Sequence, residues 1–238
     1  MFRFTLFGVP VEIQPWFWVG TAIFGGGIGA RTPAQILDVL IFMIVAAISV
    51  LVHEFGHALV GRRVGGGSAS ISLHAFGGLA FSQGGRFTRM GHFWRVAAGP
   101  GAGFSLFLLT ALALIVAFGF QSGTNLIVYL TFHQFPDFLS PSAIAFAKAE
   151  TRVEVVHQFL RINFWWSLIN LAPVLPLDGG RITDLFVTPQ RRVYQIGLVA
   201  GIAVAAFGWF GFRSTLMALM FGYFAYQNYQ MMNQVRWR

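Results

Sequence analysis

Cysteine is absent from this chain of 238 residues, and charged residues make up only 10% of it. Without thiolates, neither a disulfide framework nor a cysteine metal site can form, so any tight metal site must use His, Asp or Glu. Soluble domains carry about 25% charged residues. The shortage of charge, together with 56% hydrophobic residues and a mean hydropathy of +0.66, therefore places the chain among membrane proteins.

Acidic residues are scarce as well: eight carboxylates stand against sixteen basic residues, and all but one of the basic residues are arginine. A net charge of +8 could indicate nucleic-acid binding. The arginines instead flank apolar stretches, as they do in the cytoplasmic loops of membrane proteins, where they set orientation. We therefore expect a lipid bilayer around the chain and no nucleic-acid partner.

Apolar stretches recur along the chain, and a bilayer-spanning helix needs about 20 such residues. We expect six spans. The first, residues 11–30, is expected to be a retained helix rather than a signal peptide, because Glu12, Gln14 and Pro15 interrupt its apolar core. The other five cover residues 36–60, 96–120, 157–171, 193–212 and 214–232. The expected fold class is therefore an all-α polytopic membrane protein with about six transmembrane helices.

Residues 64–85 are too short and too polar to cross a bilayer. A run of three glycines at 65–67 breaks the preceding helix, and residues 70–75 then alternate with a period of two. Gly77 and Gly78 suit a turn before a return strand. A small β-hairpin is therefore expected, either re-entrant within the membrane part of the protein or associated with the membrane surface in the cytoplasm.

The distribution of arginine gives the orientation. With the amino terminus in the cytoplasm, eleven basic residues lie inside and four outside, while Arg161 falls within a span. The positive-inside rule favours this arrangement over its inverse. We expect a multi-pass protein of the cell (inner) membrane, with its functional site towards the cytoplasmic side.

The segment from His53 to His57 has the form H-E-x-x-H and lies near the end of the second span. Residues four apart share one face of a helix, so His53 and His57 can bind one metal ion. Glu54 can act on a water held by that metal, which is the arrangement needed to hydrolyse a peptide bond. A structural histidine pair is the weaker interpretation, because such groups in an apolar helix are costly unless they are functional.

A catalytic zinc ion needs a third protein ligand and an open position for water. Asp178 lies at the cytoplasmic end of the fourth span, at the depth of His57, and the prolines and glycines of residues 173–180 free it from helical direction. His74 on the hairpin is the rival ligand, and a helix-end turn is the alternative role for Asp178. Asn170 could bind a substrate backbone or another helix.

The H-E-x-x-H motif and the later segment 170–180, Asn-Leu-Ala-Pro-Val-Leu-Pro-Leu-Asp-Gly-Gly, together resemble the site-2 protease family of intramembrane metalloproteases. The resemblance covers most of the chain, including the hairpin and the Ala-Gly-Pro helix that begins near residue 98. It implies that His53, His57 and Asp178 bind one Zn²⁺ per chain. It also implies that Glu54 is the general base and that Asn170 helps to hold the substrate backbone.

We therefore expect residues 1–238 to form a single transmembrane metalloprotease domain, with no PDZ or CBS domain. The expected reaction is hydrolysis of peptide bonds in or near the transmembrane segment of a membrane protein, one that spans once and has already been cleaved outside. Two alternatives remain. One is a non-catalytic membrane protein that binds or transports metal, and the other is a pseudoprotease adaptor, against which the intact Glu54 argues. No oligomeric state follows from the sequence.

Overall fold

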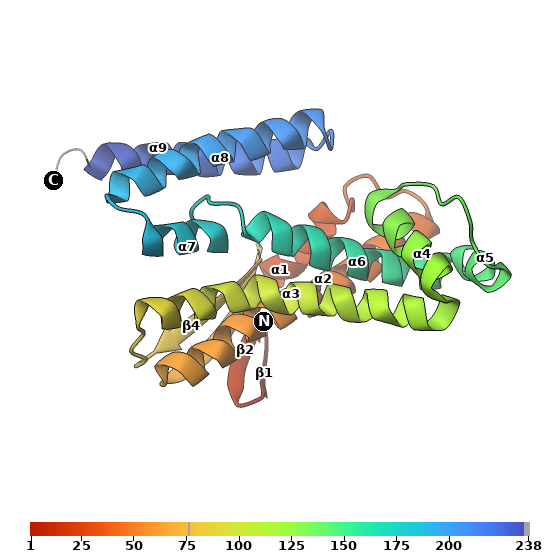
Figure 1. Cartoon of the computed structure of the whole chain (residues 1–238), viewed down its shortest axis with the longest axis horizontal. Helices are drawn as coiled ribbons and strands as arrows, with labels where there is room; N and C mark the ends of the chain where they lie inside the picture. Colours follow the sequence, from red (N-terminus) through yellow and green to blue (C-terminus); the bar gives the residue numbers. More distant parts are fainter. Residues whose placement is uncertain (76, 236–238) are drawn as a thin grey trace. The chain divides into compact units, whose positions relative to one another are not determined.

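The computed structural model describes residues 1–75 and 77–235. In chain order, its elements (Figure 1) are β1 (Phe2–Leu6), β2 (Val9–Ile13), α1 (Pro15–Phe24), α2 (Pro33–Gly65), β3 (Ser68–His74), β4 (Gly77–Gln83), α3 (Arg89–Phe118), α4 (Phe120–Phe132), α5 (Pro141–Ala147), α6 (Glu150–Asn170), α7 (Asp178–Phe186), α8 (Gln190–Phe210) and α9 (Thr215–Val235). They fall into two compact units that interleave along the chain. Unit 1 holds residues 1–86 and 98–167, and unit 2 holds residues 87–97 and the described chain from Leu168 onward.

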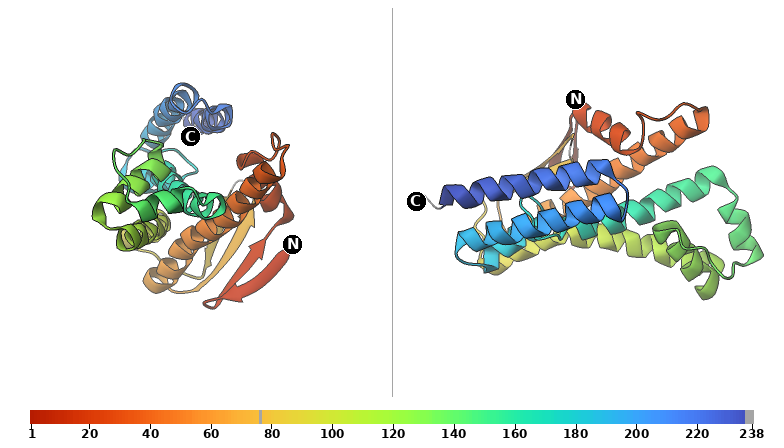
Figure 2. Two further views of the ribbon diagram at one scale, coloured as in Figure 1. Left: turned by 90° about the vertical axis from the view of Figure 1, so that its right-hand side faces the viewer. Right: turned by 90° about the horizontal axis from the view of Figure 1, so that it is seen from above.

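The four strands of unit 1 form one sheet in the order β1-β2-β3-β4. The outer pairs are antiparallel, whereas β2 and β3 run parallel with Val11 opposite Ile71. Figure 2 shows the sheet beside α2, which contacts both β3 and β4. Its inward-facing residues form one core with α1 and α2, built from Val9, Val11, Ile13, Phe17, Val50, Phe55, Ala58, Ala69, Ile71 and Leu73. The sheet therefore packs against the helix that carries the H-E-x-x-H motif.

The hairpin predicted within residues 64–85 is confirmed as β3 and β4, which pair from Ser68 opposite Gln83 to His74 opposite Gly77. It forms half of a larger sheet, since β2 extends it by pairing with β3. The two added strands come from the amino terminus of the chain, where the sequence predicted no strand.

The single helix predicted over residues 11–30 is wrong in its bounds. Residues 9–13 form β2, because their apolar side chains alternate with Pro10 and Glu12 and so meet the core with a period of two. The helix α1 begins only at Pro15, which suits the first helical position, and has ten residues. At a length of about 15 Å, α1 cannot cross a hydrocarbon core of roughly 30 Å.

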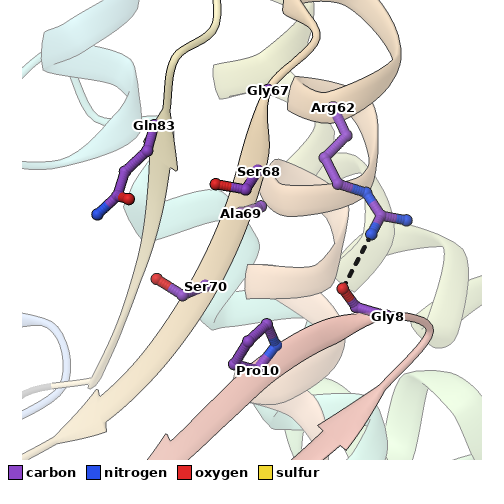
Figure 3. Close-up of a pocket in the computed structure, with 8 residues that line it drawn as sticks. All are labelled: Gly8, Pro10, Arg62, Gly67, Ser68, Ala69, Ser70 and Gln83. Atoms are coloured by element: carbon purple, nitrogen blue, oxygen red, sulfur yellow. Dashed lines mark hydrogen bonds between the residues drawn. The ribbon is translucent and has the colours of Figure 1, made fainter.

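The turn between β1 and β2 is held by the end of α2 (Figure 3). Phe7 and Gly8 have φ angles of 52° and 69°, as in a tight two-residue hairpin turn. Arg62 donates from Nη1 to the Gly8 carbonyl oxygen at 3.2 Å and from Nη2 to that of Phe7 at 3.1 Å. The Phe7 ring also meets Phe55 edge-on, with centroids 5.6 Å apart. A cavity of about 440 Å³ opens beside this contact and is lined by Gly8, Pro10, Arg62, Gly67, Ser68, Ala69, Ser70 and Gln83.

The motif-bearing helix α2 has clear signals at both ends. Thr32 and Gln35 form a capping box, in which each side chain accepts from the other residue's backbone N–H. The helix ends at Gly65 and is capped by Gly66, which has a φ of 69°. Two arginines lie in its last turn, where positive charge is favourable. Its 33 residues extend over about 50 Å, so a spanning α2 projects beyond the hydrocarbon core.

The stretch 121–156, which lies between two of the predicted spans, contains the helices α4 and α5. Together with parts of α3 and α6 they build a second core of unit 1 around Leu126 and Leu160, both fully buried. Asn163 of α6 also donates from Nδ2 to Ser49 Oγ of α2 at 2.9 Å. This buried hydrogen bond joins α6 to the motif helix one turn before His53.

Within the described chain, three helices are long and apolar enough to cross a membrane: α2, α3 and α8. Each exposes large apolar side chains of the kind that face lipid, such as Ile44, Val116 and Val199. The chain is therefore a mostly helical membrane protein with a small sheet. The six predicted spans are not confirmed, because α1 is too short and α6 and α9, though 21 residues long, are more polar.

Candidate metal centre

His53 and His57 face one another on one side of α2, as their spacing predicts. Their Nε2 atoms lie 3.1 Å apart, and their ring planes meet at 82°. Two nitrogens bound at about 2.0–2.1 Å to a tetrahedral ion lie roughly 3.3 Å apart, so this pair fits a single metal ion. Both imidazoles are buried, with 3% and 8% of their surface exposed.

Gly99 of α3 lies directly against these two imidazoles. A Cβ atom at position 99 would lie 2.8 Å from His53 Nε2 and would overlap the ring of His57. A Cβ atom at Gly56, inside the motif, would likewise overlap the backbone of Ala98 on α3. Small residues on both helices therefore allow α3 to approach α2 until it covers the Nε2 atoms of the two histidines.

Glu54 is buried and lies against β4. A Cβ atom added to Gly78 would lie 2.7 Å from both the carboxyl carbon and Oε1 of Glu54, closer than non-bonded atoms approach. Position 78 therefore requires glycine, which leaves room for the close approach of the carboxylate. The strand β4 therefore packs directly against the Glu54 side chain on α2, the helix that also carries the two histidines.

Asp178 is the first residue of α7 in unit 2 and is 4% exposed. A carboxylate in the first turn of a helix is stabilised by the helix dipole. Arg181, one turn later, places Nη1 at 3.6 Å from Asp178 Oδ1. Like His53 and His57, Asp178 offers one ligand atom from a buried side chain.

The two remaining candidates lie at the ends of their elements. Asn170 is the last residue of α6 and is buried, in unit 2. His74 is the last residue of β3, in unit 1. Burial lowers the pKa of the His74 imidazole, which favours its neutral form, and that form can also bind a metal ion.

The sequence did not identify two glycines that lie beside the site, Gly78 and Gly99. Gly78 was expected only as part of a turn, and Gly99 entered only as the glycine of the Ala-Gly-Pro helix that contributes to the family resemblance. The glycine-rich runs were the available signal. Which glycine lies against Glu54 or His57 depends on strand register and helix rotation, which the sequence pattern does not specify.

A family model described as peptidase family M50 matches residues 41–208. Two curated relatives bear the name putative zinc metalloprotease. Rip3 of Mycobacterium tuberculosis is 27% identical over 198 residues, which cover 70% of this chain and 42% of that protein. The protein sll0528 of Synechocystis is 31% identical over 216 residues, which cover 86% of this chain and 49% of that protein. The chain thus spans less than half the length of these relatives.

Among solved structures, the site-2 protease from Methanocaldococcus jannaschii matches with a TM-score of 0.56 and 19% sequence identity. The match covers 95% of this chain and 94% of the other. The fold is therefore that of the site-2 protease.

Proposed function

The chain belongs to peptidase family M50, and we propose that it is a membrane zinc metalloendopeptidase. The observation that carries the proposal is the pair of buried, facing imidazoles of His53 and His57 next to Glu54 on one apolar helix. The names of the curated relatives support zinc as the metal. His53, His57 and Asp178 would hold one Zn²⁺ per chain, and residues 1–238 would act as a single protease domain.

Zinc, when bound, lowers the pKa of a coordinated water and polarises the carbonyl of the scissile peptide bond. Glu54 accepts the proton of the attacking water at a carboxylate oxygen and returns it to the amide nitrogen of the leaving product. Gly78 leaves the carboxylate room to remain beside the two histidines while it does so. Asn170 donates its side-chain amide to a carbonyl oxygen of the substrate backbone.

The substrate is a transmembrane segment of another membrane protein. His57 precedes Arg62 by five residues, or about 7 Å of helix, so the site lies below the charged end of a spanning helix. Helical peptide bonds are shielded by their own hydrogen bonds, and the segment must therefore unwind before it is cleaved. A substrate that spans once and has already been cleaved outside meets this requirement most easily.

The arginines beyond the carboxyl end of α2 support a cytoplasmic location for that end, because positive charge collects in cytoplasmic loops. The protein then lies in the cell (inner) membrane, with water reaching the site from the cytoplasmic side. The helices α6 and α9, each 21 residues long, act as further spans beside α2, α3 and α8.

The test is cleavage by the purified full chain in liposomes. One reporter carries the target sequence within a membrane-embedded helix, and a second carries it as a soluble peptide. We expect cleavage of the embedded reporter, its loss after chelation and its return on addition of zinc. Cleavage of the soluble peptide alone would reject the intramembrane substrate. A chain that binds zinc but cleaves neither reporter would support the non-catalytic metal-binding alternative.

A further inference from the structure

Asn228 of α9 joins the last helix to the loop that leads into Asp178. We propose that Asn228 is a positioning residue, which fixes this loop and thereby sets the place of the Asp178 carboxylate. The inference rests on the proposed function, in which Asp178 is a zinc ligand. All the residues that carry it belong to unit 2.

The polar side chain of Asn228 is fully buried, with 0% of its area exposed. Its Nδ2 donates to the carbonyl oxygen of Leu175 at 2.8 Å and to that of Phe224 at 2.8 Å. The bond to Phe224 stays within α9, one turn earlier. The bond to Leu175 reaches a residue three positions before Asp178. A buried N–H group is unfavourable unless it is hydrogen-bonded, and these two bonds satisfy the Nδ2 group of Asn228.

Backbone contacts within the loop couple the position of Leu175 to that of α7. Leu177 donates its N–H to the Val174 carbonyl at 2.8 Å, and Arg181 donates to the Leu177 carbonyl at 3.0 Å. A Cβ atom at Gly180 would lie 2.5 Å from the Leu175 nitrogen, so the first turn of α7 rests directly on the loop. A shift of the Leu175 carbonyl therefore moves the backbone that carries Asp178.

The other side of Asn228 is fixed by α8. A Cβ atom at Gly197 would lie 2.7 Å from the Asn228 side-chain carbon Cγ and would overlap Oδ1. One helical turn further along, a Cβ atom at Gly201 would lie 3.0 Å from that of Ala225. The two helices run side by side (Figure 2), and the amide is enclosed between α8 and the loop. Asn228 can therefore hold Leu175 in one position only while α8 and α9 remain packed.

Residues that orient metal ligands without touching the metal typically change metal affinity about 10–100-fold when they are replaced. Asn228→Asp keeps the size of the side chain but replaces the donor with a carboxylate that repels the Leu175 carbonyl. We expect zinc affinity of the purified full chain to fall about 10-fold and zinc release to accelerate, measured by competition with a chromophoric chelator. Reporter cleavage should return at excess zinc, which a general folding defect would not allow.

The matched control is Gln230→Glu, the same amide-to-acid change at an exposed position of α9, where the Gln230 amide donates to the Tyr226 hydroxyl. A second test leaves Asn228 in place. Gly197→Ala should displace the amide and weaken zinc binding, whereas Gly222→Ala, with open space around it on the same helix pair, should not. This pair decides the outcome if Asn228→Asp does not fold.

Unchanged zinc affinity in Asn228→Asp and Gly197→Ala, in a parent chain that binds zinc through Asp178, would overturn the positioning role alone. A parent chain that binds no zinc would overturn the proposed function, and the positioning role with it. Weaker zinc binding in both controls as well would assign the effect to helix packing in general and would also overturn the inference.

Discussion

Glu54 and Gly78 lie so close together that a methyl group at position 78 would sit 2.7 Å from the glutamate Oε1 atom. Gly78→Ala should therefore displace the carboxylate while leaving the two imidazoles in place. Because a displacement of about 1 Å in a catalytic group can lower the rate about 100-fold, we expect kcat for reporter cleavage to fall by at least about 10-fold. Zinc affinity should stay at the parental value. A variant with parental kcat would show that this strand does not hold the base.

Gly99 covers the Nε2 atoms of His53 and His57, the proposed zinc ligands, so a side chain there should disturb zinc binding. We expect Gly99→Ala to weaken zinc binding and to lower stability by about 1–3 kcal/mol through overpacking. Gly101→Ala provides the control, because it makes the same change two residues later on α3 with no atom within 4 Å of the new methyl group. Chelator competition and thermal melting measure both effects. Equal zinc affinity in the two variants would contradict the placement of α3.

Asp178 and His74 are the rival third ligands, and single substitutions separate them. Removal of a direct ligand should weaken zinc binding by more than the roughly 10–100-fold typical of residues that only orient ligands. We expect this loss for Asp178→Ala, with parental affinity for His74→Ala. Asp184→Ala is the control, since its carboxylate lies later on α7 and accepts from Gln190. The reverse result would assign the third position to His74.

Arg62 holds the turn at Phe7 and Gly8 with two hydrogen bonds, whereas the exposed neighbour Arg63 makes no such contact within the described chain. The net value of such bonds at a partly exposed site is about 1 kcal/mol. Arg62→Gln should therefore lower the melting temperature by about 2–4 °C, and Arg63→Gln should leave it unchanged. Identical melting of the two variants would mean that the N-terminal hairpin docks without Arg62.

The helical part of the site could be predicted because its signals are local. The i and i+4 spacing of His53 and His57 fixes their shared face, and the structure shows their Nε2 atoms 3.1 Å apart. The hairpin of β3 and β4 followed from a two-residue period and a glycine turn. In both cases the pattern and the contact lie within a few residues of each other.

The N-terminal strands could not be predicted in the same way. β2 pairs in parallel with β3, so that Val11 lies opposite Ile71, and this contact joins segments far apart in the sequence. The tryptophans and phenylalanines that follow Pro15 gave the region the composition of a membrane-interface helix, and that composition outweighed the two-residue period of β2. The roles of Gly78 and Asn228 likewise depend on three-dimensional packing that no local pattern specifies.

The most direct test of the account replaces Glu54 with glutamine, which keeps the shape of the side chain and removes the base. Cleavage of a membrane-embedded reporter helix and zinc content are measured together in the parent and in Glu54→Gln. We predict parental zinc content and a rate that falls roughly 10²–10⁴-fold, the contribution typical of a general acid–base group. Cleavage by Glu54→Gln at the parental rate would contradict the proposed mechanism.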